Sequence, residues 1–71
     1  MNTKILKALV DLAGGEVDCV DAEAFFNQFP KSAATLRDLH TLEQLGYITL
    51  LTGDDDILDM GVNKKALDYF K

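Results

Sequence analysis

Apolar and polar positions repeat with two different periods along this chain, and the change of period separates helical from extended segments. Residues 3–13 carry apolar side chains every three or four positions, which predicts an amphipathic helix. Asn2 or Thr3 is a suitable N-cap, and Gly14 supplies the left-handed residue that ends a helix. The chain therefore opens with a helix over residues 3–13.

Extended structure is predicted next, because residues 16–20 alternate polar and apolar side chains. Asp21 then fits the N-cap of a second helix, whose apolar stripe contains Phe25 and Phe29. We expect this helix to stop at Phe29, since the residue before a proline avoids helical dihedral angles.

The third helix is predicted over residues 31–45, with Ser32 as its N-cap and Gly46 as its end. Its inward-facing positions are Leu36, Leu39, Leu42 and Leu45. These leucines share one side of a helix, so the opposite side is expected to face solvent.

After Gly46 the apolar period changes from helical to two, which indicates a β-hairpin. Residues 47–51 and 57–60 are the predicted strands, and residues 52–56 form the turn between them. Asn63 is then placed to cap a last helix over residues 64–70. The expected order is helix, short strand, helix, helix, hairpin and helix.

One α+β domain over residues 1–71 accounts for these elements, since 71 residues leave no room for a second core. The composition, 48% apolar and 27% charged, is that of a folded protein. The residues expected to be largely buried are Leu9, Phe25, Leu39, Leu42, Ile48 and Leu67.

Compartment and redox chemistry are constrained by what the chain lacks. No apolar run approaches the roughly 20 residues of a membrane span, and the first residues do not resemble a signal peptide. We therefore expect a cytoplasmic protein without membrane contact. Cys19 is the single cysteine, and its neighbours Val17 and Val20 favour a buried structural thiol.

The order of elements, together with the run from Leu39 to Ile48, resembles the winged helix-turn-helix superfamily of small bacterial and phage regulators. In that superfamily the third helix commonly ends in a leucine, acidic, glycine, apolar sequence, and Leu42, Glu43, Gly46 and Ile48 match it. The resemblance implies a three-helix core, a β-hairpin wing and a short C-terminal helix. The function that it implies first is that of a small DNA-binding regulator, whose recognition helix over residues 31–45 enters the major groove.

Carried over by position, the DNA-contacting residues would be Lys31, Ser32, Thr35, Arg37 and Thr41, with His40 and Gln44 nearby. Lysine and arginine would meet phosphate or a guanine edge, and the hydroxyl groups would supply neutral hydrogen bonds. Asp38 departs from this pattern, because a carboxylate near the phosphates can only repel them.

The charge of the chain opposes DNA binding more strongly. The formal net charge is −5, and the predicted wing tip carries Asp54, Asp55 and Asp56 where such proteins usually present arginine or lysine. The alternative function is therefore a protein-interaction module whose acidic wing docks a basic partner without binding DNA. The position of the seven basic residues in space separates these two functions, because DNA binding needs them on one face.

Catalytic and metal chemistry find little support in the residue pattern. The aspartate run lacks the alternating ligands of a calcium loop, and His40 has no second imidazole or thiolate with which to hold a metal. Ser32 and His40 would lie about 12 Å apart along one helix, at 1.5 Å per residue. We expect no enzyme activity and no cofactor.

Association is left open by the sequence. A domain this small can complete its core as a homodimer, and Leu12, Tyr69 and Phe70 near the two ends of the chain are the candidate contacts. A monomer fits the same pattern equally well.

Overall fold

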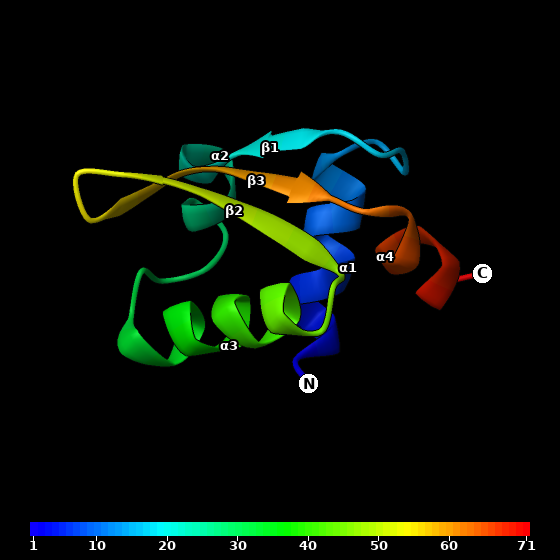
Figure 1. Ribbon diagram of the computed structural model, residues 1–71, viewed down its shortest axis with the longest axis horizontal. Coiled ribbons are helices and arrows are strands. Elements are labelled where there is room, and N and C mark those ends of the chain that lie inside the picture. Colours follow the sequence, from blue (N-terminus) through cyan, green and yellow to red (C-terminus); the bar gives the residue numbers. More distant parts are fainter.

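Four helices and a three-stranded antiparallel sheet make up the computed structural model, which describes residues 1–71 (Figure 1). The elements are α1 (Thr3–Leu12), β1 (Cys19–Asp21), α2 (Ala22–Phe26), α3 (Ala33–Gln44), β2 (Ile48–Gly53), β3 (Asp56–Val62) and α4 (Lys64–Tyr69). Their order confirms the predicted sequence of elements and the α+β class.

The sheet has the strand order β1-β3-β2, so β3 is its central strand. One face of the sheet packs on the helices, with α2 against β3 and α3 against β2. Helix α1 contacts each of the other three helices and is the centre of the helical layer. In Figure 1 the β2–β3 hairpin extends past the helices on the left, while α4 lies at the opposite end.

The core contains sixteen buried hydrophobic residues drawn from every element of the fold. Five of the six predicted core residues are buried as expected: Leu9, Phe25, Leu39, Leu42 and Ile48. Leu67 is only partly buried, because the short helix α4 turns the side chain of Ala66 fully into the core instead.

Three of the predicted helix caps are formed. The side chains of Asn2, Asp21 and Ser32 accept hydrogen bonds from the amides of Ile5, Glu23 and Thr35, respectively. These bonds satisfy amides of the first turn that have no partner within the helix.

Two predicted elements differ in detail from the structure. Asn63 lies at the N-cap position of α4, but its side chain forms no cap hydrogen bond. Its Nδ2 instead donates to the carbonyl of Gly46 at 3.1 Å, which ties the start of α4 to the segment between α3 and β2. Helix α2 ends at Phe26, three residues earlier than expected. Phe29 nevertheless reaches the core, where its ring stacks on that of Phe25 at a centroid distance of 5.0 Å.

The hairpin turn is tighter than the predicted five-residue tip. The strands continue as far as Gly53 and Asp56, which face each other, so the loop consists of Asp54 and Asp55 alone. Both residues have positive φ, at 51° and 64°, as two-residue turns matching the twist of a hairpin require. Aspartate tolerates this left-handed conformation better than most residues, which explains its use here.

Cys19 is exposed, and the prediction of a buried thiol is wrong. Along β1 the residues alternate as exposed, buried and exposed, so Val20 enters the core while Cys19 and Asp21 face outward. Val17 is also 63% exposed, and the apolar neighbour on which the prediction relied is therefore itself at the surface.

Candidate functional site

The start of α3 holds two of the predicted DNA-contacting residues in local contacts. The Oγ of Ser32 accepts from the amide of Thr35 at 3.3 Å and lies 3.2 Å from the Oγ1 of Thr35. Thr35 is buried, with only 6% of its surface exposed, because it lies on the same side of α3 as the core residue Leu39. Its expected place at a DNA groove is therefore wrong.

Both acidic residues of α3 are hydrogen-bonded within the molecule. The Oδ2 of Asp38 accepts from the Nδ2 of Asn2 at 2.9 Å, and the Oε2 of Glu43 accepts from the amide of Leu50 at 2.8 Å. Both carboxylates are half-buried in these positions. Asp38 therefore lies against the start of α1, where the side chain of Asn2 holds its carboxylate.

The exposed side of α3 carries Arg37, His40, Thr41 and Gln44 and no exposed carboxylate. The Oγ1 of Thr41 donates to the carbonyl of Arg37 at 3.0 Å, one turn earlier in the same helix. The guanidinium group of Arg37 has no acidic partner. This side of α3 is consequently neutral to basic on a chain whose net charge is −5.

Lys31 forms an ion pair with Asp56, the first residue after the hairpin turn. Its Nζ also lies 5.4 Å from the centre of the Phe26 ring, so both neighbours hold the side chain. The hydrogen bond from Lys31 and a second one from the amide of Ile57 hold the pKa of the Asp56 carboxyl group below its ordinary value of 3.8. The two residues are 25 positions apart, and no spacing in the sequence pointed to this pair.

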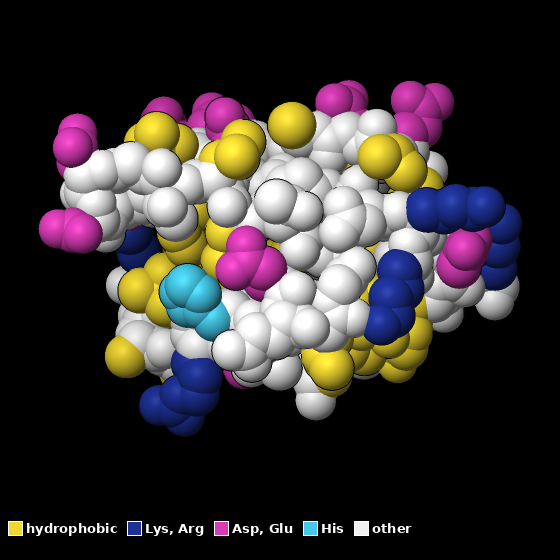
Figure 2. All heavy atoms as spheres, viewed as in Figure 1, with side chains coloured by type: hydrophobic (Ala, Val, Ile, Leu, Met, Phe, Trp, Pro, Cys, Tyr) yellow, Lys and Arg dark blue, Asp and Glu magenta, His cyan; other side chains and the backbone are white.

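Between α3 and the hairpin lies a cleft of about 330 Å³, which we call the hairpin cleft. It is lined by Lys31, Leu36, His40, Thr52, Asp55, Asp56 and Ile57. Figure 2 shows apolar side chains at the surface beside the histidine and beneath the hairpin. The cleft thus combines an apolar floor with carboxylates, and its one lysine is already neutralised by Asp56.

The acidic hairpin tip borders this cleft. Asp54 and Asp55 are both exposed, and neither has a basic partner within ion-pair distance. Figure 2 shows acidic side chains at the outermost end of the hairpin, well clear of the body of the molecule. Asp56 differs from the other two, since Lys31 balances its charge. The effective charge of the tip is therefore that of two free carboxylates.

The seven basic residues do not share a face. Lys7, Lys31 and Lys71 are paired with carboxylates, and Lys65 donates to the carbonyl of Leu45 beside the Tyr47 ring. The remaining three, Lys4, Arg37 and Lys64, come from α1, α3 and α4. In Figure 2 the basic side chains accordingly form separate patches at the two ends of the visible face.

Two further features, metal-binding clusters and membrane-spanning helices, are absent from the structure. Nowhere do three or more histidine, cysteine or acidic side chains come together in a group that could hold a metal ion. None of the four helices has the length and apolar character that crossing a membrane would require.

Comparison with family models, with curated proteins and with solved structures found no match to this chain.

Proposed function

We propose that this chain is a winged-helix domain that serves as a protein-interaction module. In this arrangement α2 and α3 form the helix-turn-helix, and the β2–β3 hairpin that follows α3 is the wing. The order of elements and the direct passage from α3 through Gly46 into β2 support this arrangement. The partner would be a basic protein segment that docks in the hairpin cleft.

The observation that carries the proposal is the chemistry of the hairpin cleft. Leu36 and Ile57 offer an apolar floor, Asp55 offers a free carboxylate in the lining with the exposed Asp54 next to it in the turn, and Lys31 is neutralised. A segment with an apolar side chain next to lysine or arginine would find a complementary contact for each group. A phosphate backbone would instead meet two unpaired negative charges.

Charge and apolar contact would contribute differently to this binding. Exposed ion pairs contribute only about 0.2–1 kcal/mol each, so the two aspartates would mainly steer a basic partner and raise its association rate. Covering an apolar side chain contributes about 25 cal/mol per Å² removed from water. The affinity would therefore depend on the apolar floor, and the preference for a basic partner on the tip.

DNA binding is the second candidate function, and one observation favours it. Asp38 and Glu43 are half-buried and accept hydrogen bonds within the molecule, so the exposed polar side chains of α3, among them Arg37, Thr41 and Gln44, include no carboxylate and are available to a base edge or phosphate. The hairpin would oppose this contact, since its tip carries negative charge where a wing would meet the backbone.

Replacing Asp54 and Asp55 with Asn separates the two functions, because asparagine keeps the shape and accepts the left-handed turn. We expect the variant to bind basic, leucine-containing synthetic peptides more weakly than the wild type, by up to roughly tenfold and mostly through the association rate. Fluorescence anisotropy measures the peptide affinity, and a mobility-shift assay with duplex DNA is run in parallel at low salt.

The matched control is Glu16→Gln with Asp18→Asn, which removes the same charge from the loop before β1. This control should leave peptide binding unchanged. If the Asp54 and Asp55 replacements instead strengthen DNA binding at low salt and leave peptide affinity unaltered, DNA is the partner and the interaction module is wrong. In that case Arg37→Ala should weaken DNA binding by about 1–3 kcal/mol.

A further inference from the structure

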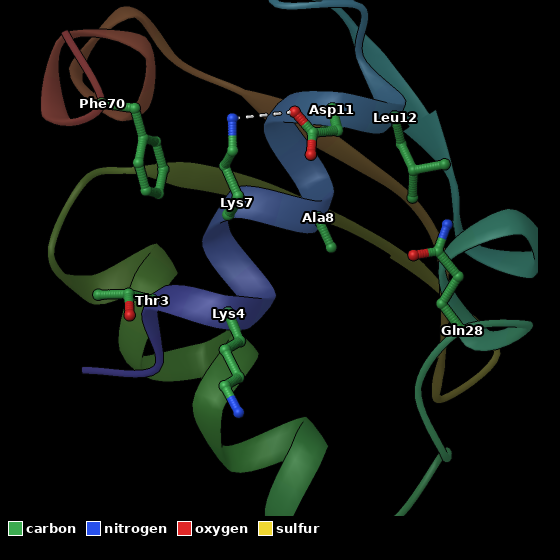
Figure 3. Close-up of a pocket in the computed structure, with 8 residues that line it drawn as sticks. All are labelled: Thr3, Lys4, Lys7, Ala8, Asp11, Leu12, Gln28 and Phe70. Carbon is green, nitrogen blue, oxygen red and sulfur yellow. Dashed lines mark ion pairs between the residues drawn. The ribbon is translucent and has the colours of Figure 1, made fainter.

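The outward side of α1 forms the floor of an open groove of about 630 Å³ (Figure 3). Its lining includes Lys4, Lys7, Ala8, Asp11 and Leu12 of α1, together with Phe70 from the end of α4. Figure 3 shows Phe70 on one side of the helix and Leu12 on the other, with the charged side chains between them. We call this surface the α1 groove.

The apolar part of the α1 groove is only half covered by the chain itself. Ala8, Leu12 and Phe70 are all partly buried, and Ala8 at the middle of the helix leaves space above it. A small residue at this position allows a second helix to approach closely, at an interaxial distance near the lower end of the roughly 8–10 Å range. The groove therefore suits a helix as its occupant.

The charges of the α1 groove are of both signs. Lys7 lies 3.2 Å from the Oδ1 of Asp11 and 5.4 Å from the centre of the Phe70 ring. Lys4 has no acidic partner. An occupant that satisfies this surface must bring a carboxylate to Lys4 and a cation to the remaining oxygen of Asp11.

We propose that the occupant is the α1 helix of a second copy of this chain, packed antiparallel about a two-fold axis. With the axis passing between Lys7 and Ala8, Lys4 of one copy comes level with Asp11 of the other, and the same contact is repeated by symmetry. Asp11 keeps its bond to Lys7, because a carboxylate accepts several hydrogen bonds. The half-covered side chains of Leu12 and Phe70 flank this contact.

Self-complementarity favours a second copy over an acidic helix from another protein. An acidic helix would satisfy Lys4, but it would also place like charge against Asp11. A second copy brings Asp11 to Lys4 and Lys4 to Asp11 at the same time, so each of the two symmetry-related contacts pairs opposite charges. This dimer does not depend on the proposed function, because the hairpin cleft shares no residue with the α1 groove.

Charge reversal with reciprocal rescue tests the dimer by analytical ultracentrifugation of the purified chain. The wild type should sediment as a concentration-dependent dimer at micromolar concentrations. Lys4→Glu alone and Asp11→Lys alone should each weaken the dimer by about tenfold or more, since each places like charges in contact twice. Mixing the two variants should restore a heterodimer, because Glu at position 4 of one chain then faces Lys at position 11 of the other.

Two controls carry the same charge changes outside the α1 groove. Arg37→Glu on α3 and Glu16→Lys before β1 should leave the dissociation constant within about twofold of the wild type, since distant sites act independently. Circular dichroism confirms that each variant is folded. A wild type that stays monomeric at millimolar concentration would overturn the proposal, and so would a mixture of the two variants that fails to recover the dimer.

Discussion

The hairpin cleft and the α1 groove each contain a lysine that is paired with a carboxylate, but only the α1 groove has a second lysine without an acidic partner. Lys31 in the hairpin cleft is paired with Asp56 and packed over Phe26, so it adds almost no net charge to that surface. Lys4 in the α1 groove has no acidic partner and is fully available. The charge that a surface presents is therefore set by pairing across the fold, and not by the basic residues counted in its sequence.

The two surfaces also differ in how they are built. Most of the α1 groove follows one ten-residue helix, whose repeat fixes the spacing of its side chains, and Phe70 and Gln28 add to its lining. The hairpin cleft lies between α3 and a hairpin that extends past the helices, and Lys31–Asp56 is the ion pair that joins its two walls (Figure 1). We expect the groove to be the more rigid surface and the cleft to be the more adaptable one.

Replacing Leu42 with Ala should disrupt both the hairpin cleft and the α1 groove, because it destabilises the whole domain. Leu42 is fully buried in α3, which packs against both α1 and β2. Its truncation should lower the free energy of unfolding by about 2–5 kcal/mol, a large part of the stability of a small domain. Chemical denaturation followed by circular dichroism measures the loss. An unchanged unfolding midpoint would mean that α3 does not pack as described.

Asn2→Ala should affect the α1 groove and spare the hairpin cleft. Asn2 caps α1 through the amide of Ile5 and also donates to Asp38 on α3, so its loss should lower the free energy of unfolding by about 1 kcal/mol. The dimer should weaken while peptide binding in the cleft is kept. Asn2→Ser is the matched control, since serine retains the cap and removes only the bond to Asp38. Equal effects of both variants would show that the cap contributes nothing.

Lys31→Met should give the smallest effect and act on the hairpin cleft alone, because methionine keeps the apolar stem over Phe26. The Asp56 carboxyl group has a lowered pKa in the folded chain, so its contribution to stability is present above about pH 4 and lost as pH falls through the folded pKa. The free energies of unfolding of the wild type and the variant should therefore differ slightly near pH 7 and become equal in acid.

Carboxyl titration followed by nuclear magnetic resonance checks this directly. In the Lys31→Met variant the pKa of Asp56 should move up toward 3.8, although the amide of Ile57 still donates to it. Titration curves that coincide for the two proteins would show that the ion pair is absent in solution.

Local sequence signals predicted the elements well, because the decisive interactions span only a few residues. Asn2, Asp21 and Ser32 cap their helices through amides two or three positions away. Gly46 has a φ of 86° just after α3, as a glycine that ends a helix should. The inward face of α1 follows from its apolar spacing. On α3 the spacing predicted Leu39 and Leu42 correctly, but Leu36 is only half-buried and Leu45 is 44% exposed, so its predicted inward position is wrong, because α3 ends just before it.

The candidate site was less predictable, because its decisive contacts join distant residues. The sequence predicts Thr35 as a DNA contact, yet it lies on the side of α3 that packs on the core and is buried. The sequence places Asp38 among the residues expected to face DNA. Its hydrogen bond to Asn2, which is 36 positions away in the chain, could not be predicted from the sequence. The pairing of Lys31 with Asp56 likewise depends on how the hairpin folds back toward α3. Periodicity carries no information about such contacts.

The bond between Glu43 and the amide of Leu50 bears on the solubility of folded chains. Strand β2 lies at an edge of the sheet, and edge strands with free amides can pair with strands of other molecules and start aggregation. Glu43 occupies an outward amide in the middle of β2, and its charge stands where an incoming strand would have to pair. The opposite edge, β1, is only three residues long. Glu43 thus hinders the pairing of β2 with a strand of another molecule.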